Sequence, residues 1–313
     1  MLATRVEEIS VTNSFVRTSE GRELPFDQLL LATGGELNLA DEDMRGVVYL
    51  RGVDDVDQID ALARELRMKP QEDRNVVVYG GGFIAFEFIN YFAHLKANTT
   101  VLMRGRGFWS SVLSDESQAL LRKTAEAHGV HVVTGVKSIS LKGDKQLEHV
   151  VADTETLPAD ILGVGIGIHP ERELFTDAGI EVRSGIVTNE YLETAHPGVF
   201  AAGDGAEFYD RFAGRHVTYG NWMNAQMQGR AVAHIMHGER KPFELVSSYS
   251  THLFDLQMVF IGDIDRQAAD NVVLARADEG ATEELFYRQG KLVGGILIGD
   301  IARRMAITAE IRG

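Results

Sequence analysis

The residues most clearly suited to chemistry are three consecutive glycines, Gly80, Gly81 and Gly82, which follow the apolar run 76–79. With Ala85 they form the pattern G-x-G-x-x-A. In a dinucleotide-binding turn, the first glycine permits a tight turn and the second lets a pyrophosphate approach the backbone. The small third residue lets helix and strand pack closely. The spacing therefore predicts a dinucleotide site, with a glycine-rich turn that binds nothing as the alternative.

The segments on either side of the glycines favour the binding site. The β-branched run 76–79 predicts a buried strand, and the apolar pattern 83–95 predicts a helix. The first N–H groups of that helix, including those of Phe83 and Ile84, lie at the positive end of its dipole and attract phosphates. Residues 99–102 predict the next parallel strand, which completes a βαβ unit.

The end of this second strand bears on the choice of nucleotide. A site for NAD usually has Asp or Glu about 20 residues beyond the glycines, where it accepts from the ribose 2′-hydroxyl. Here Met103 occupies that position, and Arg104 and Arg106 follow it. Two guanidinium groups suit a 2′-phosphate, so the sequence favours NADPH over NADH. The alternative is that both arginines are solvated surface charges.

Composition narrows the function classes. The 313 residues carry a net charge of −15 and no cysteine. The charge argues against a nucleic-acid partner and a membrane-surface helix, and no apolar run reaches transmembrane length. The absence of cysteine excludes disulfides, a redox dithiol and cysteine-ligated clusters. With no apolar core of signal-peptide length at the start of the chain, we expect a cytoplasmic protein.

The remaining pattern is mixed α/β. We expect strands at 5–10, 14–18, 29–33, 130–134, 138–141, 149–151, 160–167, directly before 203, and at 256–261, 271–275, 284–287 and 292–298. We expect helices at 54–68, 114–129, 222–236 and near 300–311. The inward-facing residues predicted for the first two of these helices are Val56, Ile59, Leu62, Leu66, Ala119, Leu120 and Ala125.

Other reactive side chains have simple structural explanations. His128 and His131 flank a helix end and a strand, and we expect them to be structural. His234 and His237 lack a third ligand in register, so no metal site is predicted. The acidic clusters 41–43 and 54–55 are interpreted as solvated surface, although 54–55 also suits a helix start.

Two further stretches, 30–34 (Leu-Leu-Ala-Thr-Gly) and 199–204 (Val-Phe-Ala-Ala-Gly-Asp), occur in a fixed order around the glycine unit. Together the three stretches resemble the pyridine nucleotide–disulfide oxidoreductase superfamily of two-dinucleotide flavoproteins. The helix starting Asn-Trp-Met-Asn-Ala at 221–225 and the segment 250–256 resemble its ferredoxin and rubredoxin reductase branch. That branch works without a redox disulfide, in agreement with the absence of cysteine.

This resemblance implies site residues. It places Glu87 close to the nicotinamide pocket as the candidate catalytic residue, and Gly165 and Gly167 along the path of NAD(P)H. It places Thr33, Gly34 and Gly203 near FAD. Asp204 would form a hydrogen bond with the ribityl chain, and Trp222 would lie near the isoalloxazine ring.

The resemblance also implies a fold and a division into domains. An NAD(P)-binding Rossmann-like domain (35–167) would interrupt an incomplete FAD-binding domain (1–34 and 168–243), and a strand-rich α+β domain (244–313) would follow. The family's own first G-x-G-x-x-G unit for FAD has no counterpart here. We therefore expect this chain to hold FAD weakly, to purify colourless or with little flavin, and to associate.

The function implied is an FAD-dependent NAD(P)H oxidoreductase. Hydride would pass from nicotinamide to flavin, and electrons would leave to a small electron-carrier protein or a small-molecule acceptor. The alternative is a non-catalytic fragment or partner subunit that binds nicotinamide dinucleotide and has lost flavin. The identity of the acceptor and homo-oligomer formation stay open at this point.

Overall fold

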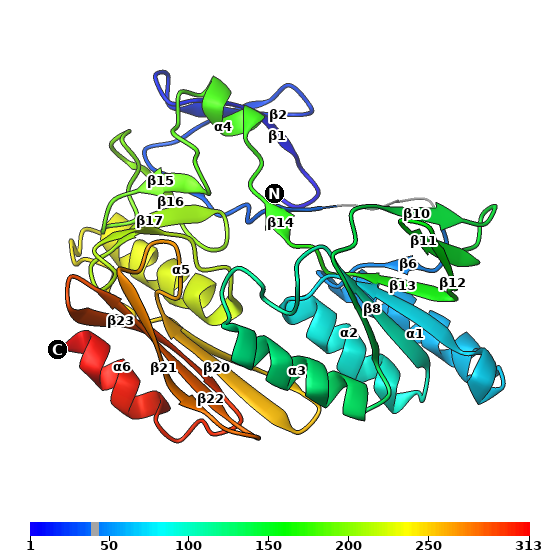
Figure 1. Cartoon of the computed structure of the whole chain (residues 1–313). Coiled ribbons are helices and arrows are strands. Elements are labelled where there is room, and N and C mark those ends of the chain that lie inside the picture. The colour runs from blue at the N-terminus through cyan, green and yellow to red at the C-terminus, as the bar shows by residue number, and fades with distance from the viewer. Residues whose placement is uncertain (39–43) are drawn as a thin grey trace.

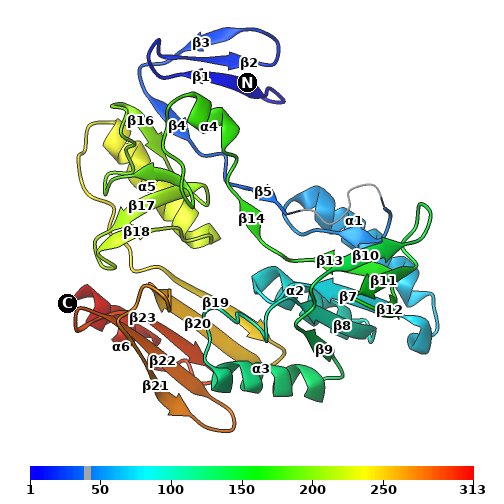
Figure 2. The ribbon, with the colours of Figure 1, turned by 45° about the horizontal axis from the view of Figure 1, so that its top comes forward.

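The computed structural model describes residues 1–38 and 44–313. Figure 1 and Figure 2 show three bodies: the C-terminal sheet with its helix, the parallel sheet with its helices, and a body that joins the N-terminal strands to a later part of the chain. The predicted acidic run 41–43 lies outside the described residues.

The parallel sheet has the strand order β6-β13-β7-β8-β9, and all neighbouring strands are parallel. Its strands are β6 (Val47–Val48), β13 (Ile161–Val164), β7 (Asn75–Tyr79), β8 (Asn98–Met103) and β9 (His131–Thr134). The strands predicted before and after the glycine unit are confirmed as β7 and β8. The antiparallel strands β10 (Ile139–Lys142), β11 (His149–Ala152) and β12 (Glu155–Pro158) form a smaller sheet beside it, and β12 was not predicted.

The helices of this body are α1 (Val53–Arg67), α2 (Phe83–His94) and α3 (Asp115–Ala127), and a short 3₁₀ turn spans Gln71–Asp73. The predicted inward faces are confirmed except at two positions. Val56 is 50% exposed because the buried stripe of α1 begins one turn later, at Ile59. Ala119 is exposed because each helical residue turns by 100°, and the stripe of α3 follows Leu121 and Ala125 instead.

Local signals set the ends of these helices. Asp55 accepts from the backbone N–H groups of Arg51 (2.7 Å) and Gly52 (2.8 Å), so it caps α1 rather than belonging to a solvated cluster. Ser114 accepts from the N–H of Ser117 (3.2 Å) at the start of α3. Gly129, with φ of +78°, ends α3 as predicted.

A second body combines residues from both sides of the parallel sheet in sequence. Strand β4 (Leu29–Leu31) pairs in parallel with β16 (Val199–Ala201), and helix α5 (Trp222–Met236) has the predicted bounds. The other elements of this body are β1 (Val6–Ser10), β2 (Phe15–Thr18), β3 (Glu23–Pro25), α4 (Glu173–Asp177), β15 (Ile186–Thr188), β17 (Ala206–Asp210) and β18 (Arg215–Val217).

The two connections between these bodies run side by side (Figure 2). Strand β5 (Glu36–Leu37) pairs antiparallel with β14 (Ile168–His169), and Asn38 donates from its side chain to the carbonyl of Ile166 (3.2 Å). A Cβ on Gly35 would lie 2.8 Å from the carbonyl oxygen of His169, so this crossing requires a residue without a side chain.

The C-terminal body is an antiparallel sheet covered by α6 (Arg304–Arg312). Its strand order is β19-β20-β23-β22-β21, with bounds β19 (Ser248–Leu253), β20 (Leu256–Gly262), β23 (Lys291–Ile298), β22 (Thr282–Arg288) and β21 (Asn271–Ala277). Strand β19 was not predicted as a strand, and α6 begins four residues later than expected.

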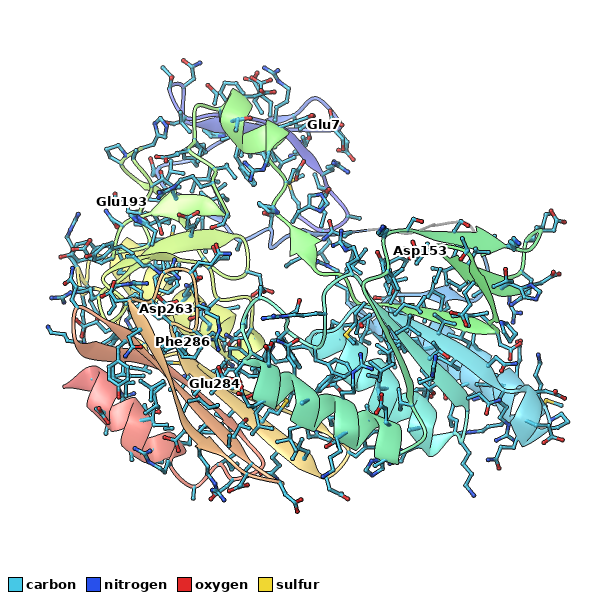
Figure 3. The ribbon with its side chains drawn as sticks, viewed as in Figure 1. Glu7, Asp153, Glu193, Asp263, Glu284 and Phe286 are labelled. Carbon is cyan, nitrogen blue, oxygen red and sulfur yellow. The ribbon has the colours of Figure 1, made fainter. Side chains whose placement is uncertain are left out.

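A buried carboxylate joins this sheet to α3. Glu284 is 1% exposed and accepts from the backbone N–H of Ser114 (2.9 Å) and the hydroxyl of Ser117 (2.6 Å). Figure 3 labels Glu284 beside the first turn of α3. A carboxylate at a helix N-terminus is stabilised by the helix dipole, and Arg266 pairs with its other oxygen.

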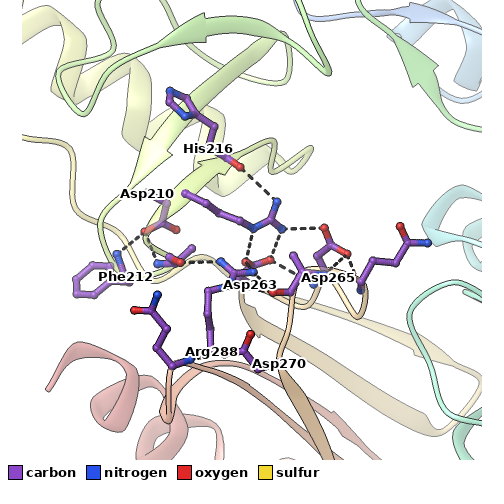
Figure 4. A network of polar contacts seen from close by, with 12 residues as sticks. Asp210, Phe212, His216, Asp263, Asp265, Asp270 and Arg288 are labelled. Carbon is purple, nitrogen blue, oxygen red and sulfur yellow. Dashed lines mark hydrogen bonds and ion pairs between the residues drawn. The ribbon is translucent and has the colours of Figure 1, made fainter.

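A second polar contact joins the C-terminal sheet to β18 (Figure 4). Arg215 donates two parallel hydrogen bonds to Asp263, both 2.7 Å long, and one to Asp265 (3.0 Å). Arg288 lies 3.3 Å from the same Asp263 carboxylate. Asp263 is 3% exposed, so these bonds replace water that the carboxylate has lost.

We expect Asp263→Ala to destabilise the protein by about 3 kcal/mol, because it leaves the guanidinium groups of Arg215 and Arg288 without their buried partner. Thermal or urea unfolding measures this loss. Asp60→Ala is the matched control, since it breaks an exposed ion pair with Arg64 and should change stability little. Equal stabilities for the two variants would contradict a structural role for the Asp263 contact.

Candidate cofactor-binding sites

The glycine unit lies where the parallel sheet reverses its order of connection. Strand β7 continues through α2 to β8 on one side, whereas β13 enters later on the other side. Ligands of open α/β sheets bind at the carboxyl ends of the strands at such a switch point. Gly80 has φ of +134°, and a Cβ there would lie 2.2 Å from the carbonyl oxygen of Gly165 at the end of β13. Gly80 and Gly165 therefore let the two strand ends meet.

Gly165 also meets the helix. A Cβ on Gly165 would lie 2.9 Å from the backbone nitrogen of Ala85, so its contribution in the structure is close packing of α2 on β13. Gly167, with φ of +90°, faces more open space, and the nearest atom to a Cβ there would be Asn38 Nδ2 at 3.8 Å. Whether either glycine lines the path of a nucleotide stays a prediction.

The other two glycines of the unit differ from each other. A Cβ on Gly81 would lie 2.6 Å from Met103 Sδ, so Gly81 is required for packing. A Cβ on Gly82 would have Trp109 Nε1, at 3.9 Å, as its nearest neighbour, so this backbone is open to an incoming group. Gly82 is also the N-cap of α2, and the N–H groups of Phe83 and Ile84 have no acceptor one turn earlier. The geometry suits a diphosphate.

The residues expected to select the nucleotide follow directly at the end of β8. Met103 is 2% exposed and packs in the core, where it offers no acceptor for a ribose hydroxyl. Arg104 is exposed. Arg106 is also exposed and lies 3.2 Å from Asp115 in an ion pair that solvent screens. Both guanidinium groups are therefore available to a phosphate.

Glu87, the candidate catalytic residue, is exposed on α2, one turn beyond Phe83. Across the described part of the chain it forms no hydrogen bond or ion pair that would fix its carboxylate. Its catalytic role stays a prediction.

The second site forms where β4 and β16 end together. Ala201 pairs with Leu31, and the strands continue into Thr33 and Gly34 on one side and Gly203 on the other. The two loops touch closely, since a Cβ on Gly205 would lie 2.5 Å from the carbonyl oxygen of Gly34. A pocket of about 480 Å³ opens beside them, lined by Thr33, Gly34, Gly35, Glu36, Leu37, Arg51 and Glu171.

Buried polar atoms without partners mark this second site. Asp204 Oδ1, Asn224 Oδ1 and Gln228 Nε2 are buried and have no hydrogen-bond partner among the described residues. Gln228 Oε1 accepts from the N–H of Gly203 (2.7 Å), which holds the loop against α5. Burial raises the pKa of Asp204, and the nearby Arg51 guanidinium opposes this shift. These acceptors and the amide donor fit a polyhydroxy chain such as the ribityl group of FAD.

Trp222 begins α5, and its side chain is 77% exposed. It is therefore not a core residue. Met223 and Met227 are also exposed on this helix. Proximity of Trp222 to a flavin ring stays a prediction.

Two of the histidines singled out in the sequence have clear contacts in the structure. His128 stacks on Phe254 with a ring-centroid distance of 3.8 Å, which confirms its structural role. His234 lies 3.4 Å from Glu239 at the exposed end of α5. Within residues 1–38 and 44–313, no three His, Asp or Glu side chains gather as a metal site would require. In the same residues, no helix has the length and apolar character needed to cross a membrane.

The open glycine loop and the acceptors that lack a partner among the described residues are features that two bound cofactors would use. The family profile of the pyridine nucleotide-disulphide oxidoreductases matches residues 1–229, and the chain belongs to this family. It is an oxidoreductase of the NAD(P)H flavoprotein class, and FAD and a nicotinamide dinucleotide are the cofactors of that class. The predicted family, fold class and enzyme class are confirmed.

The relatives with similar sequences and structures are named as rubredoxin, ferredoxin and putidaredoxin reductases. The chain is 29% identical over 317 residues to the rubredoxin-NAD(+) reductase of Pseudomonas putida, covering 99% of this chain and 80% of that protein. It is 31% identical to the 5,5′-dehydrodivanillate O-demethylase ferredoxin reductase subunit of a Sphingobium strain. This match covers 93% of this chain and 71% of that protein. The crystal structure of the covalent putidaredoxin reductase–putidaredoxin complex superposes with a TM-score of 0.84 at 25% identity. The match covers 99% of this chain and 74% of the chain in that structure.

Two residues at these sites escaped prediction. Arg51 lies in the loop before α1, and Trp109 lies in the loop after β8. Each reaches its site across the fold, so no local spacing identifies it. The run of aromatic residues at 108–109 after the two arginines was the available signal for Trp109.

Proposed function

We propose that this chain takes hydride from NADPH at the glycine loop and passes electrons through FAD to a small electron-carrier protein. The observation that supports it best is the pairing of an open Gly82 with an unpartnered Asp204 acceptor at the ends of two separate sheets. The relatives named for rubredoxin and putidaredoxin support the acceptor class. We also propose the domain limits 1–34, 35–167, 168–243 and 244–313.

At the nicotinamide site, the chain contributes binding and orientation. The N–H groups of Gly82, Phe83 and Ile84 would hold the diphosphate, with the dipole of α2 favouring its negative charge. Arg104 and Arg106 would pair with a 2′-phosphate. Glu87 would lie at the nicotinamide end and order that part of the molecule.

At the flavin site, Asp204 would accept from a ribityl hydroxyl, and Gln228 Nε2 would donate to the same chain. Thr33 and Gly34 would approach it from the end of β4, and Trp222 would shield the ring from water. FAD, when bound, accepts the two electrons of a hydride and releases them singly, which matches a two-electron donor to a one-electron carrier.

The test is anaerobic reduction of a purified rubredoxin or putidaredoxin by the chain with added FAD and NADPH, followed by the visible spectrum of the carrier. Carrier reduction that requires all three components supports the proposal. The non-catalytic alternative predicts nucleotide binding with no reduction of the carrier, even with excess FAD present throughout the assay. That result would overturn the proposal.

The nucleotide preference gives a second test. Arg104→Glu should weaken NADPH binding at least about tenfold, because hydrogen bonds to charged groups are each worth about 1.5–3 kcal/mol. NADH binding should change little. Arg312→Glu, an exposed charge reversal at the end of α6, is the control and should leave both affinities unchanged. Wild-type protein that binds NADH as tightly as NADPH would contradict the preference.

A further inference from the structure

The loop between β8 and α3 places one tryptophan against the glycine unit. Trp109 has φ of +42°, in the left-handed region that bulky residues rarely adopt. Its backbone N–H donates to the carbonyl of Gly81 (3.1 Å), and its carbonyl accepts from Val112 (2.8 Å) and Leu113 (2.9 Å). The surrounding structure holds an unfavourable backbone conformation, and the result is a fixed indole beside Gly82.

Aromatic rings from two bodies of the fold fix the orientation of this indole. Its ring packs edge-on against Phe83 (5.0 Å between centroids) and Phe86 (4.7 Å), both on α2. It also contacts Phe260 of β20 (5.3 Å), which belongs to the C-terminal sheet. Three aromatic rings therefore contact the apolar part of the indole, and its N–H group is not part of these contacts.

That polar edge faces the opening at Gly82. Trp109 Nε1 is the nearest atom, at 3.9 Å, to the position a Cβ would occupy on Gly82. Within the residues that the structure describes, the indole N–H has no hydrogen-bond acceptor. A group that approaches the Gly82 backbone as closely as a side chain would therefore meet an unused donor.

We propose that the indole N–H of Trp109 donates a hydrogen bond to the diphosphate of the bound nicotinamide dinucleotide. This inference rests on the proposed function, because it requires that the glycine loop binds that nucleotide. It adds a side-chain donor to a site otherwise built from backbone N–H groups. Since Phe260 supports Trp109, the C-terminal sheet helps to position this donor.

Trp109→Phe separates the hydrogen bond from the packing, because phenylalanine keeps an aromatic ring and lacks the N–H. We expect calorimetric titration to show ADP-ribose 2′-phosphate binding at least about tenfold more weakly than in wild type. Binding of 2′-AMP, which lacks the diphosphate, should stay within about twofold. Equal loss for both ligands would show a structural role and overturn the proposal, as would unchanged binding of both.

A second measurement applies even where Trp109→Phe folds poorly. The chain has two tryptophans, so Trp222→Phe leaves Trp109 as the reporter. We expect the fluorescence of this variant to change on saturation with ADP-ribose 2′-phosphate. Bound ligand with unchanged Trp109 emission would overturn the hydrogen bond, whereas wild-type protein that binds neither ligand would overturn the proposed function itself.

Discussion

Gly82→Val should abolish binding of nicotinamide dinucleotide and leave the protein folded. Gly82 has φ of −109° and ψ of −156°, an extended conformation that valine adopts without strain. The space in front of it is open, with Trp109 Nε1 as the nearest atom at 3.9 Å. The added Cβ therefore meets no protein backbone, and the valine side chain would occupy volume that a diphosphate needs. We expect affinity to fall more than about 100-fold, since both the N–H contacts and the close approach are lost.

A substitution at the neighbouring Gly81 should affect stability rather than binding. Gly81→Ala places its Cβ 2.6 Å from Met103 Sδ in the core, so it should lower the unfolding midpoint before it affects binding. Gly229→Ala, where no described atom outside the adjacent turns of α5 lies within 4 Å of the new methyl group, should keep affinity and raise helix stability slightly. Calorimetric titration and circular dichroism separate these outcomes. A folded Gly82→Val variant with wild-type affinity would remove the glycine loop from the site.

The glycine unit also shows what a spacing pattern can predict. The pattern identified β7, the turn and α2, because strand, glycine and apolar helix signals are local. The pattern could not predict which glycine is needed for packing and which leaves space for a ligand, because the residues that contact them come from other segments of the chain. Gly80 meets Gly165, and Gly81 meets Met103, whereas Gly82 alone of the three faces open space.

The sequence predictions that were wrong or missing also depend on contacts between distant parts of the chain. Val56 has helical spacing to Ile59, yet the stripe it was assigned to begins only where α1 meets the sheet. Strand β19 reads Ser-Tyr-Ser-Thr-His-Leu, too polar to predict alone, and pairing with β20 stabilises it. Trp109 depends on Phe260, 151 positions later in the chain, so only the folded structure could assign it.

Asp204→Ala should remove most affinity for FAD and make the flavin-free protein more stable. Asp204 Oδ1 is buried without a partner among the described residues, so the folded protein bears an unsatisfied acceptor that a ligand hydroxyl would satisfy. Losing a hydrogen bond to a charged group weakens binding by about 10- to 100-fold. Opposite changes in affinity and stability are typical of residues kept for binding.

The pH dependence distinguishes this explanation from simple loss of packing. Burial raises the pKa of Asp204, so without FAD the folded state keeps this proton to higher pH than the unfolded chain does. The resulting stabilisation is complete below the ordinary Asp pKa of about 4 and is lost as pH rises through the raised pKa. Asp204→Asn lacks this titration. Its unfolding midpoint should therefore match wild type near pH 4 and exceed it increasingly toward neutral pH, and a constant difference across this range would contradict the assignment.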